Sequence, residues 1–122
     1  MKFLPVLILI LIFGCDSNKK LDVTSFRTGK FEIPANDKYQ KTTFQRFDTL
    51  QIETYEDRID SLSIHWKDNF NYTLKMLNPK KELDQEPIHV RITGIKSNSY
   101  TFEAQIGYSN YKQKGTVIKV ED

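Results

Sequence analysis

The segment that decides the fold is residues 88–108, IHVRITGIKSNSYTFEAQIGY, in which two alternating runs flank a Ser-Asn-Ser turn. Apolar and polar side chains alternate in each run, so each run has one apolar face. The apolar residues of the two runs are Ile88, Val90, Ile92, Tyr100, Phe102, Ala104, Ile106 and Tyr108. A period of two is typical of a half-buried β-strand, and a short turn between two such runs indicates an antiparallel hairpin.

The same pattern extends outward over nearly the whole chain. The β-rich runs are residues 26–33, 42–47, 49–55, 59–66, 70–76, 88–94, 100–108 and 111–120. Turn-forming residues separate them at hairpin length, and Gly29 and Gly115 are expected to mark bends. One short helix is expected near residues 36–41. We therefore predict an all-β fold, an antiparallel meander of seven or eight strands that closes into a small barrel or a barrel-like sandwich.

Composition limits the function classes. The chain has 122 residues, enough for one domain, with 18 Lys and Arg against 16 Asp and Glu. This near balance argues against a nucleic-acid partner, because such proteins usually concentrate basic residues on one face. The single cysteine excludes an internal disulfide framework and a cysteine-based zinc site.

The N-terminal segment predicts where in the cell the protein is located. Lys2 is followed by eleven apolar residues, 3–13, which is too short for a membrane-spanning helix and fits the apolar stretch of a secretory signal peptide. The run ends Ile12-Phe13-Gly14-Cys15 and turns polar at once. This motif resembles the lipobox of bacterial lipoproteins. The resemblance implies cleavage after Gly14 and attachment of diacylglycerol to Cys15; the alternative is an incidental cysteine behind an uncleaved anchor.

These observations divide the chain into residues 1–14 as signal peptide, residues 15–25 as lipidated cysteine and polar tether, and residues 26–122 as a single β domain. The implied location is the cell envelope, with Cys15 anchored in the bilayer of the inner or outer membrane. The acidic run that resembles a surface-export signal in Bacteroidetes lipoproteins is missing after Cys15. We therefore expect the domain to face the periplasm.

The sequence contains few candidates for catalytic or metal-binding residues. His65 and His89 fall on the polar faces of their strands, and Asp57 and Asp60 fit a solvated hairpin end. The sequence contains no His-x-x-x-His, no Gly-x-Ser-x-Gly and no glycine-rich phosphate loop. We therefore expect no catalytic residues, no metal site and no cofactor.

Aromatic residues are the unusual feature. A barrel of eight strands is just wide enough to be filled by side chains or to hold one small ligand. The same aromatic residues therefore fit either a packed core or the lining of an apolar pocket. The candidate ligand-binding residues are Trp66, Phe70, Tyr72, Phe102 and Ile106. Tyr108 and Tyr111 near a strand end are candidates for a protein-contact surface.

Cys15, the short all-β body and the opening Phe-Arg-Thr-Gly-Lys-Phe at residues 26–31 resemble small uncharacterised lipoproteins of Bacteroidetes. Some of that group carry the genome label "DNA topoisomerase IV", which this sequence does not support, because a topoisomerase subunit needs hundreds of residues and a nucleotide-binding or DNA-cleavage domain. The Thr-Gly-Lys-Phe segment is also faintly similar to the Gly-x-Trp start of lipocalins. The function hypotheses are a non-enzymatic envelope module that binds another protein, and a lipocalin-like carrier or sensor of a small apolar ligand. An enzyme would require buried acidic and histidine side chains that meet in a cleft.

Overall fold

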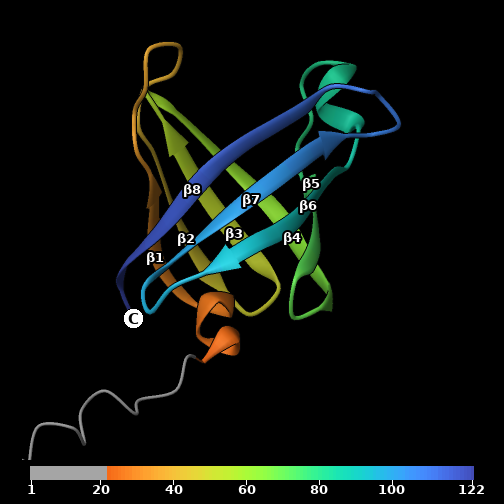
Figure 1. The fold of residues 1–122 in the computed structure, drawn as a ribbon. Coiled ribbons are helices and arrows are strands. Elements are labelled where there is room, and N and C mark those ends of the chain that lie inside the picture. The colour runs from red at the N-terminus through yellow and green to blue at the C-terminus, as the bar shows by residue number, and fades with distance from the viewer. Residues whose placement is uncertain (1–21) are drawn as a thin grey trace, which may run out of the picture.

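In the computed structural model, which describes residues 22–122, the chain forms a closed barrel of eight antiparallel strands (Figure 1). Each strand pairs with the next one along the chain, and the last pairs with the first. The strands are β1 (Gly29–Ile33), β2 (Thr42–Phe47), β3 (Leu50–Tyr55), β4 (Arg58–Asp68), β5 (Asn71–Met76), β6 (Ile88–Ile95), β7 (Ser99–Ile106) and β8 (Lys112–Glu121). The predicted antiparallel meander that closes into a barrel is confirmed.

Alternation along the strands builds the core. In β4, Leu62 and Ile64 are buried and His65 is exposed; in β7, Tyr100 is buried and Thr101 is exposed. One interior cluster collects the buried apolar side chains from every strand except β3 and from the segment before β1. Its members are Phe26, Phe31, Phe44, Leu62, Ile64, Tyr72, Leu74, Val90, Ile92, Tyr100, Phe102 and Val117.

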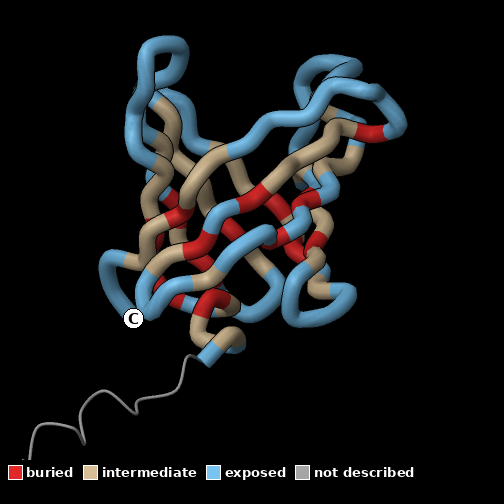
Figure 2. The backbone as a smooth tube through the Cα atoms, in the orientation of Figure 1, coloured by how far each residue is buried: buried red, intermediate tan, exposed pale blue. Residues whose placement is uncertain are grey.

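The two ends of the barrel differ. At one end, here called the closed end, the 3-10 helix η2 (Val23–Arg27) lies across the opening and buries Phe26 to 1% exposure. At the other end, here called the mouth, the loops at residues 34–41, 56–57, 77–87 and 107–111 stand above the core. The loop at residues 77–87 carries η3 (Leu83–Gln85), between β5 and β6. Figure 2 shows buried positions along the strands and in η2, and exposed loops at both ends. Within residues 22–122, no helix has the length and apolar character needed to cross a bilayer.

Two local expectations differ from the structure. Residues 22–25 were expected in the tether, but they belong to the turn of η2, where Asp22 accepts a hydrogen bond from the Thr24 amide at 3.0 Å. The polar composition of residues 22–25 gives no sign that the next residue, Phe26, is the buried one that fixes η2 to the barrel. The signal peptide at residues 1–14 and Cys15 lie outside the described residues.

The short helix expected near residues 36–41 is wrong. The Asn36 side-chain oxygen accepts hydrogen bonds from the amides of Lys38 and Tyr39, both at 2.8 Å. The Asn36 amide donates to the Tyr39 carbonyl at 2.9 Å. This side-chain turn satisfies the backbone groups that a helix would have paired, so a loop forms instead.

Two aromatic residues expected on inner faces are exposed. Phe70 is 47% exposed because it lies in the turn between β4 and β5. Tyr108 is 97% exposed because Gly107, with φ of 55°, turns the chain immediately after β7 ends at Ile106. Both residues follow the end of a strand or lie in a turn, where alternation no longer decides which way a side chain points.

Candidate functional site

The mouth of the barrel contains a hollow of about 450 Å³. Its residues come from the loop after β1, from the mouth ends of β2 and β3, and from the facing strands β7 and β8. They include Ile33, Tyr39, Gln40, Thr42, Tyr55, Phe102, Gln113 and Gly115. Small-molecule sites measure roughly 300–1,000 Å³, so this hollow is large enough for one small ligand or one inserted side chain.

Gly115 makes room for the aromatic floor of this hollow. Gly115 pairs with Phe102 across β7 and β8. A Cβ atom at position 115 would lie 2.8 Å from Cζ of the Phe102 ring, which is closer than such contacts occur. The bend expected at Gly115 is therefore not its role, since β8 continues through it and the glycine leaves space for the Phe102 ring.

Tyrosines surround the hollow. Tyr39 and Tyr111 are 40% and 55% exposed, and a hydrogen bond between their side chains raises the pKa of Tyr39 above its ordinary value. The Tyr55 hydroxyl accepts a hydrogen bond from the Gln40 amide at 3.2 Å. These two contacts hold the loop at residues 34–41 against the rest of the rim.

The inner wall of β3 and β4 carries two carboxyl groups. Glu53 faces inward and accepts a hydrogen bond from the Gln51 side-chain amide at 3.1 Å. Burial raises the pKa of Glu53, and the nearby charge of Asp60 adds to the effect. Asp60 pairs with Arg58, whose Nε lies 2.8 Å from the Asp60 carboxylate. The interior is thus polar on this side and apolar on the side of Phe102.

A buried arginine lies below, in the packed part of the barrel. Arg46 is 2% exposed and donates three hydrogen bonds of 2.9 Å, to the Gln51 side chain, to the Phe26 carbonyl and to the Tyr100 hydroxyl. The Tyr100 hydroxyl lies 2.7 Å from that of Tyr72, and burial raises the pKa of Tyr100 well above its ordinary value.

Aromatic rings surround the Arg46 guanidinium. Its central carbon lies 4.8 Å from the ring centre of Phe44, 4.7 Å from that of Tyr72 and 5.0 Å from that of Phe31. Cation–π contacts of this kind favour a desolvated guanidinium. Because Arg46 is enclosed and hydrogen bonded to η2, we assign it a structural role as the floor of the barrel.

The five candidate ligand-binding residues do not share one pocket. Phe102 lines the mouth hollow. Trp66 and Tyr72 pack against each other in the lower half, with ring centres 4.6 Å apart. Phe70 is exposed at the closed end, and Ile106 is half-buried at the mouth end of β7.

Sequence reasoning missed Arg46, Glu53 and Tyr55. The inward position of Arg46 could have been predicted, because Phe44 is apolar and the residue two positions later in a strand must share its face. Glu53 and Tyr55 share the face of Gln51, but the aliphatic residues of that strand, Leu50 and Ile52, lie on the opposite face and give the wrong signal.

Comparison with known proteins adds no assignment, since no family model, curated protein or solved structure matches this chain.

Proposed function

We propose that this chain is a membrane-anchored, non-enzymatic envelope module that binds another envelope protein at the mouth of its barrel. The observation that carries the proposal is the difference between the two ends. η2 and Arg46 fill the closed end, whereas the mouth has an open hollow with exposed tyrosines around it.

The position of the N-terminus supports an orientation in which the mouth faces away from the membrane. Seven peptide bonds separate Cys15 from Asp22, which begins the described chain at the closed end. At about 3.3–3.6 Å per residue, that segment reaches at most about 25 Å. An acyl group on Cys15 would therefore keep the closed end near the bilayer and leave the mouth on the side away from it.

The rim has the chemistry of a protein-contact surface. Tyr39, Tyr108 and Tyr111 are exposed on two loops of the mouth. Tyrosine combines a large apolar ring with a hydroxyl group, and it is enriched in protein–protein interfaces. A partner that inserts one apolar side chain into the hollow would bury it against Phe102 and cover the rim tyrosines.

A second candidate function uses the same hollow. Its volume and its apolar side, formed by Ile33, Tyr55 and Phe102, favour a carrier or sensor of a small apolar ligand. The two candidates differ in what occupies the mouth, so one pair of experiments separates them.

The first experiment places a photocrosslinking amino acid at Tyr108 in cells of the native host, with a matched probe at Asp48 in the closed-end turn between β2 and β3. The proposal expects a discrete protein adduct from position 108 and none from position 48. Equal adducts from both positions, or none from either, would reject the mouth as a protein site.

The second experiment is native mass spectrometry of the detergent-extracted lipoprotein. A bound species of a few hundred daltons that is lost in Phe102→Trp, which fills the hollow, would establish the carrier function instead. A bare chain in both proteins would reject a tightly held ligand.

A further inference from the structure

Cationic side chains gather on the outer wall of the barrel from the end of β4 to β8. This basic wall consists of Lys67, Lys75, Arg91, Lys112 and Lys114, all exposed, with the histidines His65 and His89 beside them. Glu103 is the one acidic residue among those that line the groove in this wall. Asp37, Asp48 and Asp57 lie in loops at the two ends, away from the wall.

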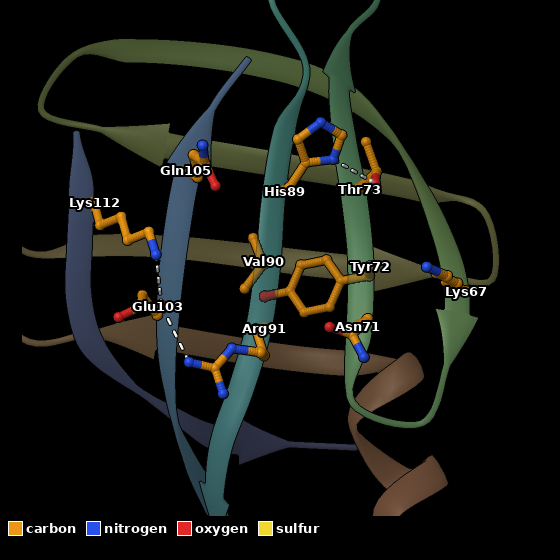
Figure 3. Close-up of a pocket in the computed structure, with 10 residues that line it drawn as sticks. All are labelled: Lys67, Asn71, Tyr72, Thr73, His89, Val90, Arg91, Glu103, Gln105 and Lys112. Carbon is orange, nitrogen blue, oxygen red and sulfur yellow. Dashed lines mark hydrogen bonds and ion pairs between the residues drawn. The ribbon is translucent and has the colours of Figure 1, made fainter. Parts of the chain in front are cut away.

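A groove of about 330 Å³ crosses this wall (Figure 3). Its floor is low because Asn71 and Thr73 are short, and the Thr73 hydroxyl lies 3.1 Å from Nδ1 of His89. Lys67 borders the groove on one side and Lys112 on the other. The groove thus runs across the strands, between long cationic side chains.

Glu103 shows how a carboxylate sits in this groove. One of its carboxylate oxygens, Oε1, lies 3.1 Å from Nη2 of Arg91 and 3.8 Å from Nζ of Lys112. The hydrogen bond from Arg91 lowers the pKa of Glu103. Both cations remain more than half exposed, at 60% and 53% of their side chains. Their remaining donors are therefore free to meet a second anionic group from solvent.

We infer that the groove binds an extended acidic segment of a partner protein, whose carboxylates pair with Lys67, Arg91 and Lys112. Neighbouring strands lie about 4.8 Å apart, so the four strand spacings from β4 to β8 cover about 19 Å, the length of roughly six extended residues. The groove is recessed, so a single extended chain fits into it. A flat bilayer would touch the convex wall only along a line, which favours a peptide segment over a membrane as the partner. This surface lies on the side of the barrel, so the inference goes beyond the mouth and does not depend on what binds there.

The test measures fluorescence anisotropy of a labelled octaglutamate peptide with the full lipoprotein in a non-ionic detergent. The charge-reversed variant Lys67→Glu/Lys112→Glu is expected to bind at least 10-fold more weakly. The matched control, Lys38→Glu/Lys96→Glu, makes the same change in net charge at exposed lysines outside the wall and is expected to change binding less than 2-fold. Circular dichroism confirms that each variant is folded.

Other results would overturn the inference. Equal weakening in both double variants would show a response to net charge alone, and equal binding of octaglutamine would exclude carboxylate recognition. Stronger competition by phosphatidylglycerol vesicles or duplex DNA than by octaglutamate would reassign the wall to lipid or nucleic acid. Binding that survives Tyr39→Ala/Tyr111→Ala, the expected result, separates this surface from the mouth.

Discussion

At the scale of single residues, Arg46 connects three parts of the chain that are far apart in sequence. It lies on β2 and binds η2 through Phe26, β3 through Gln51 and β7 through Tyr100. Removing the guanidinium takes this donor away from the Gln51 side-chain oxygen and the Phe26 carbonyl inside the barrel, whereas the Tyr100 hydroxyl keeps Tyr72 as a partner. The loss of a buried hydrogen-bond partner costs about 1–3 kcal/mol for each group left unpaired.

Arg46→Met is therefore expected to lower the free energy of unfolding by about 3 kcal/mol or more, as measured by urea denaturation. Tyr72→Phe is the matched control, since it removes only the contact with the Tyr100 hydroxyl, and it is expected to cost about 1 kcal/mol. A methionine variant as stable as the native protein would show that the rings, rather than the hydrogen bonds, hold this region together.

The buried carboxyl of Glu53 predicts a pH effect. Burial raises the pKa of Glu53 above its ordinary value of 4.5, so the folded chain holds this proton more tightly than the unfolded chain. The contribution of Glu53 to stability is therefore greatest at low pH and falls as pH rises from about 4.5 through the folded pKa.

We expect Glu53→Gln to remove this loss of stability at higher pH. Unfolding free energies of both proteins between pH 4 and 8 test it: the native protein should lose stability relative to the variant as pH rises. Asp22, Asp68 and Glu103, whose pKa values are lowered by hydrogen bonds, act in the opposite direction in both proteins and cancel in the difference. Parallel curves would contradict the burial of Glu53.

At the scale of strands and turns, alternation in the sequence was sufficient to place most of the barrel. Residues 42–47 were expected as a strand and form one with the same ends. The ends of some strands could not be predicted, because local hydrogen bonds that hydropathy does not report decide where those strands stop. The Asp68 carboxylate, for example, accepts from the Phe70 amide at 2.8 Å and turns Phe70 out of the strand.

The candidate site was less accessible from sequence than the strands. Phe102 was identified because it lies within a clear alternating run. Arg46 was not, because its partners Phe26 and Tyr100 are 20 and 54 residues away, and their proximity appears only after the barrel has closed. The basic wall was hidden for the same reason, since Lys67 and Lys112 lie on strands far apart in the chain.

The pairing of Gly115 with Phe102 makes a prediction for the hollow. Gly115→Ala would push its new methyl group against the ring and is expected to cost about 1–3 kcal/mol, as overpacking does. Phe102→Leu in the same chain shortens the opposing side chain and should recover part of that loss. Thermal unfolding of both single variants and the double variant measures the coupling; strictly additive effects would mean that the alanine is accommodated elsewhere.

At the scale of the whole molecule, closure of the barrel depends on its shortest seam, between β1 and β8. β7 and β8 pair over seven residue positions, whereas β1 and β8 pair at three: Lys30 with Glu121, Phe31 with Lys119 and Glu32 with Ile118. η2 strengthens this seam, because Lys119 donates a hydrogen bond to the Ser25 carbonyl at 2.6 Å.

Ending the chain after Val117 removes every β8 residue of this seam. We expect that truncation to abolish the cooperative unfolding transition and to expose β1 as a free edge, which favours aggregation. Calorimetry and size-exclusion chromatography measure the two effects. Lys119→Ala, which removes the side-chain contacts with Ser25, Asp122 and Phe31 but leaves β8 in place, should instead keep a cooperative transition at a lower midpoint.

The pairing of the first strand with the last also affects how the chain is made. During synthesis, each hairpin from β1–β2 to β7–β8 can form soon after its residues emerge, because neighbours in the barrel are neighbours in the chain. β1 is different, since its second partner, residues 118–121, is translated after all the other strands of the barrel. The nascent chain therefore carries an unpaired edge until residues 118–121 appear, and a chaperone that covers β1 would be most useful until then.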